Sequence, residues 1–150
     1  MSKVSIKKQL TVEAPIERAF RVFTANMTTW WPKSHHIGKS PLAQCVVEPR
    51  VGGRWYEVDE DGSECDWGQV LAWEPPHRLV LAWQLDATFA FNRELVTEVE
   101  VRFSELAPQR TRVDFEHRDL EKIGNVIEGP QSMDTGWGMI LEEFVRSAAG

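Results

Sequence analysis

The side chain best suited to acid–base chemistry in this sequence is His117, at the end of a segment in which apolar and polar residues alternate. It shares strand parity with Thr111, Val113 and Phe115, so we expect it to point inward. An imidazole in a pocket can act as a general acid or base. The alternative, which we favour, is a histidine that fixes the end of the last strand by hydrogen bonds, because a buried polar group needs partners. No matching nucleophile or orienting base is visible, so His117 is a catalytic candidate only.

Two histidines and two cysteines are candidate ligands for a soft metal ion. His35 and His36 are adjacent, and Cys45 and Cys65 are the two cysteines of the chain. Imidazole and thiolate are the ligands that such ions prefer. The spacing of the four residues follows no known ligand pattern, and the cysteines form no C-x-x-C pair. We therefore expect no metal and no cofactor, and reduced thiols.

A glycine pair and an acidic run are two further motifs to consider. Gly52-Gly53 belongs to no phosphate-binding motif that leads from a strand into a helix, so we predict a tight connection between strands. Acidic residues cluster where a hairpin turn is expected, either as a docking surface for a basic partner or, as we favour, as a solvated turn. These residues are Asp59, Glu60, Asp61 and Glu64.

Alternation of apolar and polar residues predicts a strand at residues 4–12 and further strands from residue 42 onward. Two helical segments separate the first strand from the rest. The first is an apolar stripe that follows Pro15, and the second is a short turn over residues 26–31 that Pro32 should end. The later strands are expected near residues 45–47, 54–58, 65–73, 79–85, 98–103 and 111–117.

The C-terminal segment carries the longest helical pattern. Apolar residues follow Trp137 at i+3, i+4, i+7, i+8 and i+11, opposite a charged face. A sheet with one apolar face needs a covering layer, so we predict an α+β fold in which an antiparallel sheet wraps this helix.

Length, charge and composition narrow the possible functions. A chain of 150 residues fits one domain over residues 1–150. A net charge of -6 with scattered basic residues argues against nucleic acid as a partner. The sequence has no export signal and no run of 18 apolar residues, so we expect a cytoplasmic protein that does not enter a membrane. Seven tryptophans against one tyrosine suit a roomy core or pocket.

Short motifs are spread along almost the whole chain. They are residues 12–20 (VEAPIERAF), 30–32 (WWP), 48–54 (EPRVGGR), 67–70 (WGQV), 74–79 (EPPHRL), 116–118 (EHR) and 136–137 (GW). Together these motifs resemble the START-like, or SRPBCC, superfamily with its helix-grip (Bet v-like) fold. More narrowly, the chain is similar to the family named activator of heat shock protein 90 ATPase homologue-like. This resemblance implies a curved antiparallel sheet of six to seven strands around a long C-terminal helix, with two short helices after the first strand.

Three functions are compatible with this resemblance. We favour non-catalytic binding of a small hydrophobic ligand in a cavity between the C-terminal helix and the sheet. The first alternative is a co-chaperone-like interaction domain with a filled pocket, which contacts a chaperone or other protein through the acidic turn or the Trp30-Trp31 segment. The second is an enzyme resembling the polyketide cyclases, with His117 as its acid or base. The ligand and the oligomeric state stay open. The candidate ligand-binding residues are Trp67, Trp83, Phe103, His117, Trp137 and Leu141.

Overall fold

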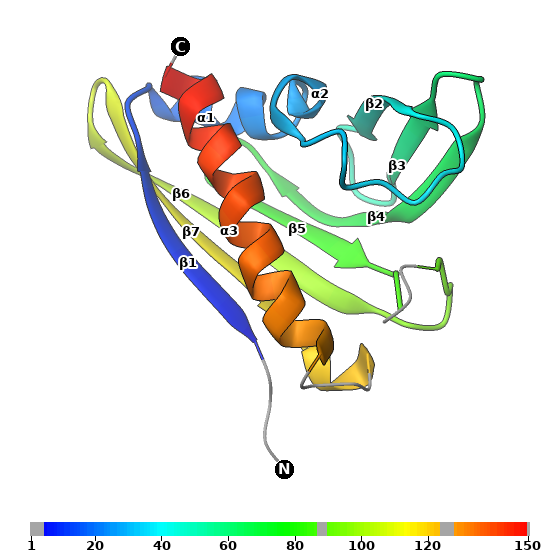
Figure 1. Ribbon diagram of the computed structural model, residues 1–150. Coiled ribbons are helices and arrows are strands. Elements are labelled where there is room, and N and C mark those ends of the chain that lie inside the picture. The colour runs from blue at the N-terminus through cyan, green and yellow to red at the C-terminus, as the bar shows by residue number, and fades with distance from the viewer. Residues whose placement is uncertain (1–4, 87–89, 124–127, 150) are drawn as a thin grey trace.

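A curved seven-stranded sheet forms one layer of the molecule, and the C-terminal helix lies across its concave face (Figure 1). The computed structural model describes residues 5–86, 90–123 and 128–149. The strands are β1 (Ile6–Val12), β2 (Leu42–Val47), β3 (Arg54–Asp59), β4 (Glu64–Glu74), β5 (Arg78–Trp83), β6 (Thr97–Ala107) and β7 (Arg110–Arg118). The helices are α1 (Ile16–Phe23), α2 (Met27–Trp30), the 3-10 helix η1 (Leu120–Ile123) and α3 (Glu128–Ala149).

All neighbouring strands are antiparallel, in the order β1-β7-β6-β5-β4-β3-β2. The two short helices follow β1, as the sequence predicts, and α1 and α2 both contact α3. Of the helices described, none has the length and apolar character needed to cross a membrane. The predicted helix-grip fold is therefore confirmed.

The sheet bends along β4. Irregular pairing interrupts the register of β4 with both neighbouring strands, and such bulges bend a strand. Gly68 lies at this bend, opposite Trp55 on β3 and Trp83 on β5. Because Gly68 has no side chain, the two indole rings meet across it, with ring centroids 5.7 Å apart. A β-carbon at Gly68 would also overlap the carbonyl oxygen of Ala82, at 1.6 Å.

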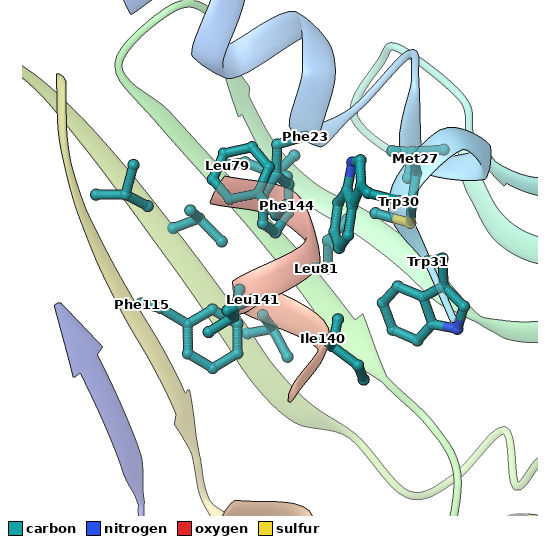
Figure 2. Close-up of a cluster of buried hydrophobic side chains, with 14 of the residues drawn as sticks. Phe23, Met27, Trp30, Trp31, Leu79, Leu81, Phe115, Ile140, Leu141 and Phe144 are labelled. Atoms are coloured by element: carbon teal, nitrogen blue, oxygen red, sulfur yellow. The ribbon is translucent and has the colours of Figure 1, made fainter. Parts of the chain in front are cut away.

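The apolar stripe of α3 packs onto the sheet and onto the two short helices, as Figure 2 shows. Phe144 is fully buried, and its ring lies 5.0 Å from that of Phe23 on α1 and 5.3 Å from that of Trp30 on α2. The main chain near the C-terminus is held by Arg18, which donates a hydrogen bond to the carbonyl oxygen of Ala148. The C-terminal turns of α3 are thereby fixed in a dense core, whereas Met133, Gly136, Trp137 and Ile140 line a pocket.

Candidate functional site

A pocket of about 330 Å³ lies between the first half of the described α3, strands β4 and β5, and the loop that follows α2. It is therefore at the place where the sequence predicts a cavity, between the C-terminal helix and the sheet. Its surface is mostly apolar. The lining residues are Trp31, Ser34, His35, His36, Ile37, Trp67, Trp83, Leu85, Met133, Gly136, Trp137 and Ile140.

Four of the twelve lining residues are tryptophans. The rings of Trp31 and Trp67 have centroids 4.9 Å apart, and Trp137 contacts both Trp31 (5.8 Å) and Trp83 (5.5 Å). Buried indoles need a partner for their N–H group. Trp31 donates to the carbonyl oxygen of His35 (2.7 Å), Trp67 to a carboxylate oxygen of Glu57 (2.9 Å) and Trp137 to His117 (3.1 Å). With these donors satisfied by the protein, the rings present apolar surface to the pocket.

The polar part of the wall comes from the loop between α2 and β2. Ser34, His35 and His36 all line the pocket there, and the hydroxyl of Ser34 lies 2.9 Å from Nδ1 of His35. The polar side chains of the lining are thus concentrated on one loop. A few polar groups that orient a ligand in a largely apolar hollow are typical of small-molecule sites.

Three of the six predicted ligand-binding residues, Trp67, Trp83 and Trp137, line the pocket. The other three do not. Phe103 packs against the rings of Phe20 and Phe23, and Leu141 is buried in the core. Strand parity predicts which face of the sheet a side chain lies on. It does not predict whether the side chain meets the packed core or the pocket, because that depends on where along the sheet the residue lies.

His117 lies behind the pocket wall, fully buried beside Trp83 and Trp137. Its Nδ1 accepts the hydrogen bond from Trp137, and its Nε2–H donates to Oγ1 of Thr97 at 2.8 Å, which in turn donates to the carbonyl oxygen of Trp83. Burial lowers the pKa of His117 to about 3, so the ring is neutral at physiological pH. Both ring nitrogens form hydrogen bonds within the protein. This geometry is that of a histidine that orients the pocket residue Trp137.

The predicted acidic turn divides into a buried and an exposed part. Glu60, Asp61 and Glu64 are exposed, but Asp59 is only 2% exposed, which corrects the expectation of a fully solvated turn. The reason is strand parity: Asp59 ends β3 and shares the inward face with Trp55 and Glu57.

The Trp30-Trp31 segment is also buried, contrary to the expectation that it could contact a partner. Trp30 is 3% and Trp31 is 5% exposed. Trp30 donates a hydrogen bond to the carbonyl oxygen of Val22, and Trp31 stands in the pocket wall. The segment therefore builds the interior of the molecule.

Beside the pocket, Glu57, Asp59 and His36 form a cluster. Glu57 is fully buried; its Oε1 accepts hydrogen bonds from the amide of Ile37 and from Trp67, and its Oε2 accepts one from the amide of Gly38. Burial raises the pKa of Glu57, but hydrogen bonds with Asp59, the two loop amides and Trp67 lower it to a net value below the ordinary one. The neighbouring Glu57 carboxyl and burial raise the pKa of Asp59.

The cysteines do not join the histidines in a metal site. In the described part of the chain, the one group with metal-binding geometry is His36, Glu57 and Asp59. Cys45 and Cys65 instead pair with Glu57 across the two neighbouring strands, and both thiols are free. Burial, followed by the nearby charge of Glu57, raises the pKa of both thiols.

Several pocket residues lie outside the predicted set. Trp31, Ser34, His35, His36 and Ile37 come from a loop whose path has no periodicity, and the WWP motif was the single local signal for them. Met133, Gly136, Trp137 and Ile140 are at positions i, i+3, i+4 and i+7, so the helical spacing contained the information needed to add the other three to Trp137.

Comparison with known proteins places this geometry in a family. Residues 13–149 match the family described as Activator of Hsp90 ATPase homolog 1-like protein. Among solved structures, the anthrahydroquino-gamma-pyrone synthase Txn09 is 35% identical, with 95% of each chain covered and a TM-score of 0.69. The self-sacrificing resistance protein CalC from Micromonospora echinospora is 30% identical, with 96% of this chain and 93% of CalC covered and a TM-score of 0.69.

Two more distant similarities add less. The Aha1 dimer from Colwellia psychrerythraea is 15% identical with a TM-score of 0.67, covering 97% of this chain and 96% of that one, and shares the fold. A curated protein, NAD(P)H-quinone oxidoreductase subunit M from Prochlorococcus marinus (strain MIT 9312), is 35% identical over 54 residues, which are 36% of this chain and 47% of that protein. The match along residues 13–149 decides the assignment: the chain belongs to the Activator of Hsp90 ATPase homolog 1-like family, within the START-like superfamily.

Proposed function

We propose that this protein binds a small, largely apolar aromatic molecule in the tryptophan-lined pocket and does not transform it. The observation that carries the proposal is the convergence of Trp31, Trp67, Trp83 and Trp137 on one hollow. Aromatic rings prefer offset or edge-to-face contact with other rings, so four indoles, three of them with N–H groups bonded within the protein, favour a planar aromatic guest over an aliphatic chain.

The size of the pocket suits a molecule of a few fused rings. Its volume of about 330 Å³ lies at the lower end of the range of roughly 300–1,000 Å³ for small-molecule sites. It is about twice the cavity of roughly 150 Å³ that accommodates benzene. A bicyclic or tricyclic aromatic compound therefore fits better than a lipid chain.

The relative Txn09, which is 35% identical, supports the same ligand class. Txn09 is a synthase of an anthrahydroquino-gamma-pyrone, a fused aromatic compound by its name, and CalC is a resistance protein. CalC, which is 30% identical to this chain, is named a resistance protein and not a synthase. We infer from this chain's pocket that sequestration of an aromatic compound is its function.

Gly136 allows a direct test of the binding site. It lies on α3 in the pocket wall, and a β-carbon built there meets nothing within 4 Å. Gly136→Leu should fill the hollow and also favour the helix, because leucine has a higher helix propensity than glycine by about 0.5–1 kcal/mol. Gly138→Leu is the matched control, since Gly138 lies on the same helix but outside the set of pocket residues.

The experiment is a titration of intrinsic tryptophan fluorescence with 1-hydroxyanthraquinone, with octanoate as an acyclic comparison. We expect saturable quenching for the natural sequence and for Gly138→Leu, and at least about tenfold weaker binding for Gly136→Leu. Equal binding by all three proteins, or a preference for octanoate, would contradict the proposal.

A second function, catalysis on such a ligand, has one geometric observation in its favour. His35 lies in the polar wall with its Nδ1 close to the hydroxyl of Ser34, within reach of a bound molecule. His35, rather than the enclosed His117, would then act as acid or base. Catalysis by His35 can be tested by incubating the protein with aromatic polyketides and analysing the products by mass spectrometry. Turnover that is lost in His35→Gln but kept in His77→Gln, a change at an exposed histidine, would favour the enzyme. Binding without any change of mass would favour sequestration.

A further inference from the structure

Unpartnered polar atoms are concentrated beside the pocket, where the loop after α2 meets the end of β3. Four buried side-chain nitrogen and oxygen atoms have no hydrogen-bond partner in the described part of the chain. Three of them belong to this cluster: Nδ1 of His36 and both carboxylate oxygens of Asp59, which can hydrogen-bond to Glu57 only when a proton lies between the two carboxyl groups. Buried polar groups are nearly always satisfied, so such a concentration needs a physical explanation.

The two buried carboxylates of the cluster also need a physical explanation. Glu57 and Asp59 are 0% and 2% exposed and lie side by side, and no arginine or lysine forms an ion pair with either of them among the described residues. Two buried carboxylates cannot both stay ionised at low cost without a positive charge between them. Either one proton is shared by the pair, or protonated His36 supplies the positive charge, or a metal cation completes the cluster.

The donor set and its spacing favour a cation. Nδ1 of His36 lies 3.4 Å from Oε2 of Glu57, which is long for a hydrogen bond. Two donors bound to one ion at roughly 2.0–2.2 Å with tetrahedral angles lie about 3.3–3.6 Å apart, so 3.4 Å suits a shared ion. Ligand atoms of His36, Glu57 and Asp59 all lie within 4.8 Å of one another.

The surrounding hydrogen bonds hold the site in shape. Oε1 of Glu57 is fully used by two donors, whereas Oε2 accepts one amide hydrogen bond and keeps one acceptor position open toward the cluster. Hydrogen bonds to a coordinating carboxylate are a common feature of metal sites, where they orient the ligand. Trp67, a pocket residue, supplies one of them.

We propose that His36, Glu57 and Asp59 bind one divalent first-row transition-metal ion at the edge of the pocket. Imidazole suits zinc, iron and copper, and carboxylates suit manganese, so one histidine with two carboxylates matches Mn²⁺, Fe²⁺ or Zn²⁺ better than Ca²⁺ or Mg²⁺. This proposal does not depend on the binding of an aromatic molecule, because the three metal-coordinating side chains all come from the protein.

Mn²⁺ is the appropriate probe, because the thiols of Cys45 and Cys65 lie on the strands next to Glu57 and would attract softer ions. Free Mn²⁺ gives a six-line electron paramagnetic resonance signal in solution that is lost on binding. Titration of the natural protein should remove the signal of one Mn²⁺ per chain, and Zn²⁺ should displace it, as expected from the order of metal affinities.

His36→Gln and Asp59→Asn should each weaken Mn²⁺ binding at least about tenfold. Glu60→Gln is the matched control, because it removes the same charge one residue away on an exposed side chain. Mn²⁺ should also raise the melting temperature of the natural protein and of the control but not of His36→Gln. Should Asp59→Asn fail to fold by circular dichroism, His36→Gln decides alone, since its side chain comes from a loop.

Two results would overturn the proposal. If Mn²⁺ at millimolar concentration keeps its full signal in the presence of the protein, no metal ion binds, and protons alone compensate the charge of the two carboxylates. If all variants bind Mn²⁺ as the natural protein does, the ion is attracted by the net charge of -6 and not by this cluster.

Discussion

Trp67 on β4 donates a hydrogen bond from its indole nitrogen to Oε1 of Glu57 on the neighbouring strand β3, at 2.9 Å. This bond joins the two features that define the molecule. Trp67 presents its ring to the pocket, and Glu57 is fully buried in the cluster with Asp59 and His36. The pocket wall and the carboxylate cluster are thus one connected structure.

Trp67→Phe tests the strength of this connection. The phenyl ring keeps most of the apolar contact but cannot donate, so Oε1 of Glu57 loses one of its two donors. Loss of a hydrogen bond to a buried charged group costs about 1.5–3 kcal/mol. Urea unfolding should show a loss of that size, whereas Trp73→Phe on the half-buried Trp73 should cost clearly less. Equal losses would mean that packing alone explains the effect.

The strands and the C-terminal helix could be predicted from the periodicity of the sequence. Period-two alternation predicted the positions of β6 and β7, and the apolar stripe predicted α3 from Trp137 onward, because a strand or helix with one buried face repeats the same contact along its length. The helix begins earlier, at Glu128, where Gly129 and Pro130 indicated a connecting segment. The curved antiparallel sheet followed from the need to cover α3. Local periodicity and the motifs resembling the family therefore sufficed for the fold.

The candidate site was predicted only in part, for physical reasons that are visible at particular residues. Trp67, Trp83 and Trp137 are on regular elements and lie in the pocket wall. His36 is on an irregular loop, and the contact between it and Asp59 joins residues 23 positions apart through a path that no spacing encodes. Burial of Asp59 was missed because a charged residue in a turn is usually solvated.

His117 should make stability depend on pH. Its pKa is about 3 in the folded protein and about 6.5 in an unfolded chain, so between these values the unfolded chain binds more protons and the free energy of unfolding falls as the pH falls. From pH 7.5 to 5.5 the loss from this group is about 1.4 kcal/mol. Asp59, whose pKa is raised, acts in the opposite direction.

His117→Gln isolates that effect from the contribution of Asp59. The variant should be less stable than the natural protein at pH 7.5, and the gap between the two should shrink by about 1.4 kcal/mol at pH 5.5, because glutamine does not titrate. Urea unfolding at both pH values measures the gap. A gap that does not change with pH would show that His117 is protonated as readily in the folded protein as in the unfolded chain.

Gly38 is predicted to be required for the cluster. A β-carbon at this position would lie 1.7 Å from Oδ2 of Asp59 and 2.9 Å from Oε2 of Glu57, so the loop must move away from β3 to accept it. Gly38→Ala should therefore destabilise the protein by about 1–3 kcal/mol. Thermal unfolding checks this, with the exposed Lys39→Ala as the neighbouring control. An unchanged melting temperature for Gly38→Ala would contradict the tight contact between loop and strand.

The central claim is that an aromatic molecule occupies the hollow lined by Trp31, Trp67, Trp83 and Trp137. The most direct measurement is a ¹H–¹⁵N spectrum of the seven indole N–H groups, assigned by single Trp→Phe variants, during titration with 1-hydroxyanthraquinone. We predict saturable shifts for the four lining indoles and little change for Trp73, which lies outside the pocket. Shifts spread evenly over all indoles, or none at ligand excess, would contradict the claim.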